Sequence, residues 1–288
     1  MTTEILLTND DGIDAVGIGA LYDALATDYE VTVVAPATNQ SGVGGERSWW
    51  DTTVEFDDHE LGYAVDGTPA DCVAVGLTAL EIDPDLVVSG CNHGPNIGSH
   101  ILGRSGTVGA AMEAAYLDVP GIALSLYDRA DLPVGADVSR GDFSVASDVA
   151  RRLVSRYERA GLPADADVLN VNVPAADDAA GPADELTHRL TEPARGFDVL
   201  EYEPTAADGG EQAEQRDDDG FVEPRGEAGL EFRDRFWREL LDFDVSDDVG
   251  SDRRAVVDGE VSVSPLSTSN STLSSGGGME TGAKLDRI

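Results

Sequence analysis

Two adjacent carboxylates, Asp10 and Asp11, follow an apolar run at residues 5–8 and precede Gly12. Apolar residues at near-helical spacing come next, so the acids stand between a predicted strand and a predicted helix, where open α/β sheets build their sites. Neighbouring carboxylates repel each other and cost desolvation energy unless a cation lies between them. The pair therefore suggests a metal site, although a helix N-cap followed by a first-turn acid would explain it equally well.

Three further loops have a similar polar, glycine-containing composition. They are residues 36–42, 89–98 and 104–109, and the first two directly follow apolar runs with strand character. Because the carboxyl ends of parallel strands lie at one edge of a sheet, we expect these two loops to converge with residues 9–12.

The side chains in these loops are oxygen donors. Asp10, Asp11, Ser41 and Asn92 offer carboxylate, hydroxyl and amide oxygens, a set that suits a hard cation such as Mg²⁺ or Mn²⁺ with water in the remaining positions. Taken singly, Ser41 and Asn92 are explained as turn residues. The prediction of a metal site depends on the loops taken together.

Ser105, Gly106 and Thr107 stand at the start of a predicted helix. Hydroxyl groups, free backbone N–H groups and the positive end of the helix dipole make such a start suitable for phosphate. Ser105 by itself is better explained as the helix N-cap. A metal beside a phosphate site would indicate phosphoryl transfer or phosphoester hydrolysis.

The elements that would position these loops alternate between strand and helix over the first 175 residues. The hydrophobic patterns predict strands at residues 5–8, 31–35, 86–89, 122–126 and 168–173, and helices at 16–26, 70–80, 107–117 and 143–160. This order predicts an α/β fold with a mostly parallel sheet and helices on both faces.

The chain changes character after Pro174. Residues 175–220 are rich in Asp, Glu, Ala and Gly without clear periodicity, and residues 256–265 alternate again as a strand or a hairpin would. We therefore expect a catalytic core at residues 1–175 and a less regular C-terminal part at 176–288 with an acidic loop, together forming one domain overall.

The formal net charge is −37, from 56 acidic and 19 basic residues. Such a surface repels nucleic acids and anionic membranes, and a hydrophobic content of 41% is too high for a disordered chain. The composition is typical of proteins from a salt-loaded cytoplasm, where salt screens the self-repulsion.

Two cysteines, Cys72 and Cys91, do not make a disulfide framework, and we find no secretory signal. No apolar run approaches the roughly 20 residues that a membrane span needs. We therefore expect a soluble, cytoplasmic protein.

The loop motifs, taken in order, resemble the SurE family of metal-dependent acid phosphatases and 5′(3′)-nucleotidases. The likeness is closest over residues 4–126, and it is carried by residues 9–12, 33–36, 41–42, 67–73, 84–90, 92–98 and 105–108. The resemblance implies a Rossmann-like domain with a C-terminal extension whose hairpin serves oligomerisation, usually into a dimer or tetramer.

The resemblance also implies roles for individual residues. One divalent cation, Mg²⁺ or Mn²⁺, would be held by Asp10, Asp11, Ser41 and Asn92. The substrate phosphate would lie by Asn96, Ser105, Gly106 and Thr107. Asp10 or Asp11 would act as general base in the hydrolysis of nucleoside monophosphates to nucleoside and phosphate.

The chain departs from the family pattern near the site. Arg104 stands where a Tyr is usual, and residues 44–50 replace a loop rich in Ser and Thr. Trp49 and Trp50 in that loop could stack on a nucleobase or pack against a neighbouring subunit. Two other functions stay open. One is a phosphatase that forms an aspartyl-phosphate, whose usual D-x-D pattern is missing, and the other is a nucleotide-binding sensor or structural protein without turnover.

Overall fold

The computed structural model describes residues 2–128, 138–163, 165–181, 185–196, 235–241 and 245–268. The chain divides into one compact unit made of residues 1–195 and 246–288 and a second unit at residues 196–245. The predicted acidic loop falls mostly outside the described residues. No helix in the described part of the chain is both long and apolar enough to cross a membrane.

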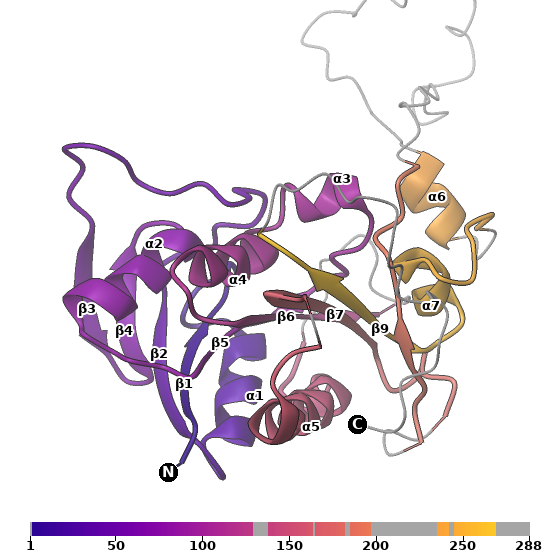
Figure 1. The fold of residues 1–288 in the computed structure, drawn as a ribbon, viewed down its shortest axis with the longest axis horizontal. Coiled ribbons are helices and arrows are strands. Elements are labelled where there is room, and N and C mark those ends of the chain that lie inside the picture. Colours follow the sequence, from indigo (N-terminus) through magenta and orange to yellow (C-terminus); the bar gives the residue numbers. More distant parts are fainter. Residues whose placement is uncertain are drawn as a thin grey trace, which may run out of the picture. The chain divides into compact units, whose positions relative to one another are not determined.

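A mixed, mostly parallel sheet forms the centre of the first unit (Figure 1). Its strands lie in the order β3-β4-β2-β1-β5-β6-β7-β9-β8. Their bounds are β1 (Glu4–Thr8), β2 (Glu30–Pro36), β3 (Glu55–His59), β4 (Gly62–Asp66), β5 (Leu86–His93), β6 (Gly121–Tyr127), β7 (Val168–Pro174), β8 (His188–Leu190) and β9 (Val261–Leu266). The pairs β3–β4 and β7–β9 are antiparallel, and every other neighbouring pair in this order is parallel.

Helices cover both faces of this sheet (Figure 1). In the first unit they are α1 (Val16–Leu25), α2 (Pro69–Ala74) with a π-helical turn at Val75–Ala79, α3 (Ser99–Leu102), α4 (Gly106–Tyr116), α5 (Ser144–Ala160) and α7 (Asp252–Val257). Helix α6 (Arg235–Leu241) belongs to the second unit. The predicted α/β class with helices on both faces is confirmed.

The middle of strand β1, residues 5–7, shows why three consecutive apolar residues stand there. Ile5 and Leu7 pack into the core beside α1 and α5, whereas Leu6 packs on the opposite face beside α2 and α4. Side chains alternate across a strand, so a strand covered by helices on both faces has to be hydrophobic throughout.

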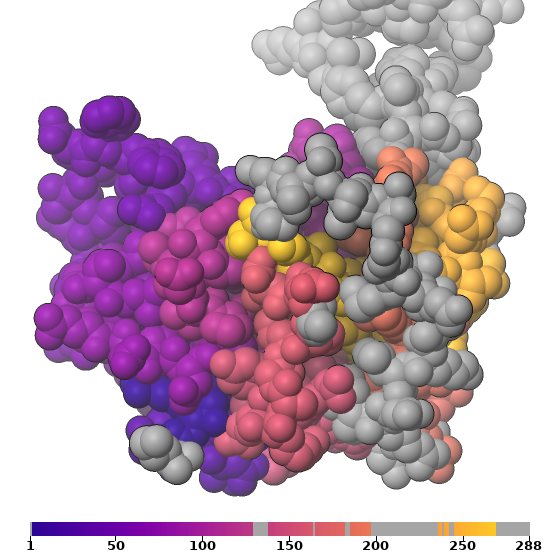
Figure 2. Space-filling view, viewed as in Figure 1, coloured from indigo at the N-terminus to yellow at the C-terminus, as the bar shows by residue number. Residues whose placement is uncertain are grey.

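The C-terminal strands complete the same sheet. Leu266 on β9 packs beside Val108 and Ala111 of α4, and the yellow atoms of β9 meet the magenta atoms of α4 in Figure 2. Residues 256–265, expected as a strand or hairpin, form the end of α7 and most of β9.

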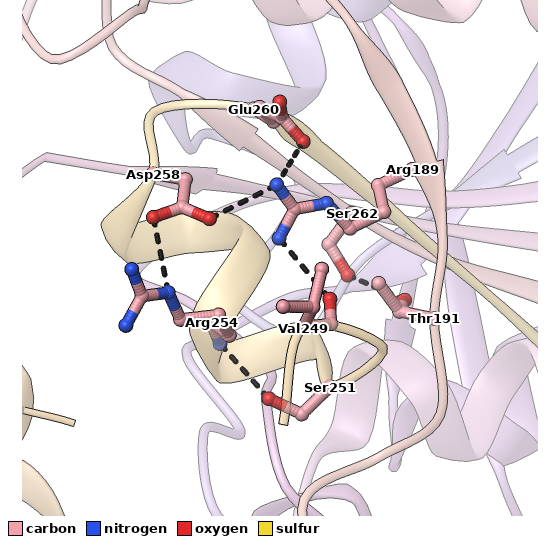
Figure 3. Close-up of polar contacts among 8 residues, drawn as sticks. All are labelled: Arg189, Thr191, Val249, Ser251, Arg254, Asp258, Glu260 and Ser262. Atoms are coloured by element: carbon pink, nitrogen blue, oxygen red, sulfur yellow. Dashed lines mark hydrogen bonds and ion pairs between the residues drawn. The ribbon is translucent and has the colours of Figure 1, made fainter. Parts of the chain in front are cut away.

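An arginine ties β8 to α7 and β9 (Figure 3). Arg189 Nη2 lies 2.9 Å from Asp258 Oδ2 and 2.5 Å from Glu260 Oε2. Its Nη1 donates to the carbonyl of Val249 at 3.2 Å, while Asp258 also accepts from Arg254 at 3.1 Å. The guanidinium therefore holds together three chain segments that meet only in the folded state.

Two differences from the predicted elements bear on the site. Strand β5 continues to His93 through an irregularity between Ser89 and Asn92, so Asn92 pairs with Ser125 of β6 and lies in a strand rather than a loop. The hairpin of β3 and β4 has no counterpart in the prediction, because β3 is an exposed acidic edge strand without a hydrophobic face.

Candidate active site

The loops after β1 and β2 meet the last residue of β5 at the carboxyl edge of the sheet. Strand β1 lies between β2 and β5 and is parallel to both, so their chain ends face the same direction. Ser41 Oγ lies 3.4 Å from Asp11 Oδ1, and the N–H of His93 lies 3.4 Å from Asp11 Oδ2. The N–H of Gln40 donates to the carbonyl of Asp10 at 2.7 Å. The predicted convergence of these loops is confirmed.

Asp10, which follows β1, is buried against the first residues of helix α4. Thr107 Oγ1 donates to Asp10 Oδ1 at 2.6 Å. Burial raises the pKa of Asp10, and the hydrogen bonds from the Thr107 hydroxyl and from the backbone N–H groups of Thr107 and Gly106 oppose that rise. A Cβ on Gly106 would lie 2.7 Å from the Cβ of Asp10, so this close approach requires glycine.

Asp11 is held more loosely than Asp10. Burial raises the pKa of Asp11 to about 6 and the charge of Asp10 adds to the rise, against hydrogen bonds from the His93 N–H and the Ser41 hydroxyl. Among the residues that the structure describes, no arginine or lysine forms an ion pair with either carboxylate. Two desolvated carboxylates without a positive partner fit a divalent cation between them.

The remaining donors of the predicted metal set are neutral. The Asn92 Nδ2 donates to the carbonyl of Gly94 at 2.6 Å, which leaves its amide oxygen as the group able to bind a metal. In the described part of the chain no cluster of three or more His, Cys, Asp or Glu residues is placed to hold a metal. The predicted metal set is therefore two carboxylates, one hydroxyl and one amide, each of which offers an oxygen to a hard cation.

Of the predicted phosphate-binding residues, Gly106 and Thr107 contact Asp10, and the side chains of Asn96, Ser105 and Thr107 already have protein partners. Ser105 Oγ accepts from the Val108 N–H at 3.0 Å and so caps α4. The Asn96 Nδ2 donates to Ser125 at 2.8 Å and to Thr107 at 3.4 Å. In this structure the N–H groups of Gly106 and Thr107, which open α4, hydrogen-bond to the carboxylate of Asp10.

Three buried polar side chains near the site were absent from the prediction. Asn170 and Asn172 on β7 hydrogen-bond to the backbone of Asn96, and Asp252 at the start of α7 accepts from the Gly98 N–H at 2.7 Å. Two asparagines spaced by two within the apolar run 168–173 were a usable signal, since amides are seldom buried in a strand without partners. Asp252 gave no local signal.

The loop between β2 and β3 passes the start of α4, where the Gly44 N–H donates to the carbonyl of Arg104 at 3.0 Å, and it carries two exposed aromatic side chains. Arg47 pairs with Glu113 of α4 at 2.6 Å, and its guanidinium lies 5.3 Å from the ring centroid of Trp49. Trp49 and Trp50 are 67% and 97% exposed. The structure therefore leaves both indole rings available to a ligand or to another subunit.

Comparison with known proteins gives one family. The family model described as "Survival protein SurE" matches residues 5–195. A protein of Natronomonas pharaonis named 5′-nucleotidase SurE is 47% identical over 271 residues, covering 93% of this chain and 94% of the relative. A protein of Haloarcula marismortui with the same name is 43% identical over 270 residues, covering 93% and 90%.

A solved structure agrees with these matches. The crystal structure of the SurE protein from Aquifex aeolicus superimposes with a TM-score of 0.71 at 31% identity, covering 93% of this chain and 95% of that one. The family model spans more than half of the chain, and the relatives match nearly all of it. The chain therefore belongs to the SurE family.

Proposed function

We propose that this chain is a metal-dependent 5′-nucleotidase that hydrolyses nucleoside monophosphates to nucleoside and phosphate. The observation that carries the proposal is a pair of adjacent carboxylates, the buried Asp10 and the partly buried Asp11, that form no ion pair among the described residues. The Ser41 hydroxyl lies 3.4 Å from Asp11 Oδ1. The name 5′-nucleotidase SurE, shared by relatives that match 93% of the chain, supports the same reaction.

In this proposal one divalent cation, Mg²⁺ or Mn²⁺, is held by Asp10, Asp11, Ser41 and Asn92. A bound cation of this kind polarises a phosphoryl oxygen and lowers the pKa of a bound water. Asp10 is fixed by Thr107 and by backbone donors, so it serves to hold the site rigid. Asp11, which has longer contacts at 3.4 Å, is the better candidate for the general base that accepts the proton of the attacking water.

The phosphate is placed at the start of α4 in the same proposal. Asn96, Ser105, Gly106 and Thr107 surround this position, and N–H donors there would stabilise the charge that develops on the phosphoryl oxygens. The exposed Trp49 and Trp50 would bind the nucleobase or bury themselves in a homodimer or homotetramer.

Phosphate release from a panel of 5′- and 3′-nucleoside monophosphates tests the proposal. The wild-type protein should release phosphate with Mn²⁺ or Mg²⁺ in molar salt and should stop when EDTA is added. Asp11→Asn should lose about 100-fold or more in kcat, since general-base catalysis contributes roughly 10²–10⁴-fold. Asp14→Asn is the matched control, because Asp14 is a nearby carboxylate whose side chain is 86% exposed.

Three outcomes would overturn the proposal. Full activity in EDTA would remove the cation from the mechanism. A burst of product with a phosphate label on Asp10 or Asp11 would show an aspartyl-phosphate instead. Nucleotide binding without phosphate release with any of the metals tested would indicate a nucleotide-binding sensor instead of an enzyme.

A further inference from the structure

Beneath the proposed site, a row of buried polar side chains runs from β7 to Asp10. Asn170, Asn172, Ser125 and Thr107 are fully buried and Asn96 is 6% exposed. Leu169, Val171 and Val173 face the hydrophobic core on the side of α5. Because side chains alternate along a strand, Asn170 and Asn172 face the opposite side, where α4 lies.

The side chain of Asn172 hydrogen-bonds to both the N–H and the C=O group of Asn96. Its Oδ1 accepts from the Asn96 N–H at 2.8 Å, and its Nδ2 donates to the Asn96 carbonyl at 3.0 Å. Asn170 Nδ2 donates to the same carbonyl at 2.8 Å. A residue held through its N–H and its C=O at once has little freedom to rotate, although Asn96 lies outside any helix or strand.

The fixed backbone directs the Asn96 side chain toward Asp10. Asn96 Nδ2 donates to Ser125 Oγ at 2.8 Å and to Thr107 Oγ1 at 3.4 Å. Thr107 Oγ1 in turn donates to Asp10 Oδ1 at 2.6 Å. A hydroxyl has a single proton to donate, so the Asn96 contact favours the rotamer in which Thr107 gives that proton to the carboxylate.

The geometry points to Asn172 as a positioning residue that sets the orientation of the Asp10 carboxylate through Asn96 and Thr107. The side-chain hydrogen bonds described for Asn172 go to the backbone of Asn96 and to none of the four proposed cation ligands. Residues that orient metal ligands from behind typically contribute about 10- to 100-fold in metal affinity or activity. This inference rests on the proposed function, since it takes Asp10 to be a ligand of the cation.

Strand β9 supplies matched control variants. Ser262 lies opposite Asn172 in the β7–β9 register, and Ser264 lies opposite Asn170. Both serines are fully buried, and both hydrogen-bond to Thr191 at 2.8 Å rather than to Asn96. Replacing a serine by alanine therefore removes a buried hydrogen bond from the same layer without touching the row that leads to Asp10.

The test compares full-length Asn172→Ala with Ser262→Ala in molar salt. Free Mn²⁺ measured by electron paramagnetic resonance gives the Kd of the metal, and hydrogen exchange reports the backbone amides of residues 96–98. Asn172→Ala should raise the Kd for Mn²⁺ about tenfold or more and should speed exchange at Asn96. Ser262→Ala should change the Kd for Mn²⁺ and the exchange rate at Asn96 by less than about twofold, even if its Tm falls as much as that of Asn172→Ala.

Equal Mn²⁺ affinity and equal exchange in the two variants would overturn the inference. If Asn172→Ala does not fold, Asn170→Ala is compared with Ser264→Ala instead. Asn170→Ala should then raise the Kd for Mn²⁺, by less than is expected for Asn172→Ala. Equal Kd values in these two variants would overturn the inference. The proposed function fails separately, when the wild-type protein neither binds Mn²⁺ nor releases phosphate. In that case hydrogen exchange at Asn96 would still test whether Asn172 fixes the backbone of Asn96.

Discussion

At the scale of single residues, Gly106 decides how closely helix α4 approaches the carboxylate of Asp10. A Cβ at this position would meet Asp10 Cβ at 2.7 Å and Asp10 Oδ2 at 2.9 Å. Gly106→Ala should therefore displace Asp10 and lower kcat/KM about 10- to 100-fold. Steady-state hydrolysis of a nucleoside monophosphate with saturating Mn²⁺ measures the effect.

Gly103→Ala is the control for Gly106→Ala. Gly103 ends helix α3 with φ −67°, and the nearest heavy atoms to its added Cβ lie at 3.8 Å. This variant should keep its activity within about twofold, because alanine fits both the space and the backbone conformation. Equal losses in the two variants would contradict the role of the close approach to Asp10.

Asp252 predicts a pH dependence of stability. Burial raises the pKa of its carboxyl to about 6, against hydrogen bonds from the N–H groups of Gly98, Ala194 and Arg253, whereas the unfolded value is 3.8. The folded chain therefore binds this proton more tightly than the unfolded chain. The stability linked to the proton is complete below about pH 4 and is lost as the pH rises through about 6.

Asp252→Asn removes that titration. The free energy of unfolding of the wild type should fall between about pH 4 and pH 7. In the variant this fall should be smaller, and the difference between the two falls should reach up to about 3 kcal/mol. Its absolute stability should be lower, because the amide group cannot accept from all three backbone donors. Urea unfolding across this pH range in molar KCl measures both quantities, and parallel curves would show that Asp252 does not titrate there.

At the scale of secondary-structure elements, the ion pairs of Arg189 hold β8 against α7 and β9. The side chain of Arg189 is 10% exposed, and those of Asp258 and Glu260 are 28% and 14% exposed. Removing the guanidinium would leave two neighbouring carboxylates with little solvent. Arg189→Met should therefore lower the free energy of unfolding by an amount at the low end of roughly 3–5 kcal/mol, as measured by urea unfolding.

Arg151→Met is the matched variant on the surface. Arg151 pairs with Asp28 at 2.6 Å, but the two side chains are 45% and 47% exposed. Exposed ion pairs contribute about 0–1 kcal/mol, so this variant should differ little from the wild type. A similar loss in both variants would show that the burial of the Arg189 pairs is unimportant.

At the scale of the whole molecule, a net charge of −37 dominates. Self-repulsion of this size destabilises the compact state. Salt screens the repulsion, because the Debye length falls from about 10 Å at 0.1 M salt to about 3 Å at 1 M. The protein should unfold in dilute buffer and refold in molar KCl, as followed by circular dichroism. The two relatives described above come from halophilic archaea, in agreement with this expectation.

The acidic edge strand β3 offers a direct test of the screening argument. Asp57 and Asp58 are both exposed. Asp57→Lys with Asp58→Lys should lower the KCl concentration at the folding midpoint, since the pair changes the net charge by four units. Full refolding in dilute buffer by millimolar Mg²⁺ alone would instead indicate specific ion binding.

Local patterns in the sequence determined the order of the elements and the composition of the site. The apolar run of β1 and the helical spacing of α5 are properties of a few consecutive residues, so the class of fold could be predicted from them. Asp10, Asp11, Ser41 and Asn92 were identified by their place after apolar strands, which a parallel sheet brings to one edge. The family assignment from these motifs is confirmed by the match over residues 5–195.

Tertiary structure decided which polar groups meet. Asn172 reaches Asn96 across 76 residues of sequence, and Asp252 reaches Gly98 across 154. The proton of Thr107 goes to Asp10, and Ser105 caps its own helix. Such partners depend on the packing of strands and helices that are distant in the chain, and a hydroxyl or an amide can pair with whichever group the fold brings near. The residues able to do chemistry are therefore visible in the sequence, whereas their orientation is a property of the folded chain.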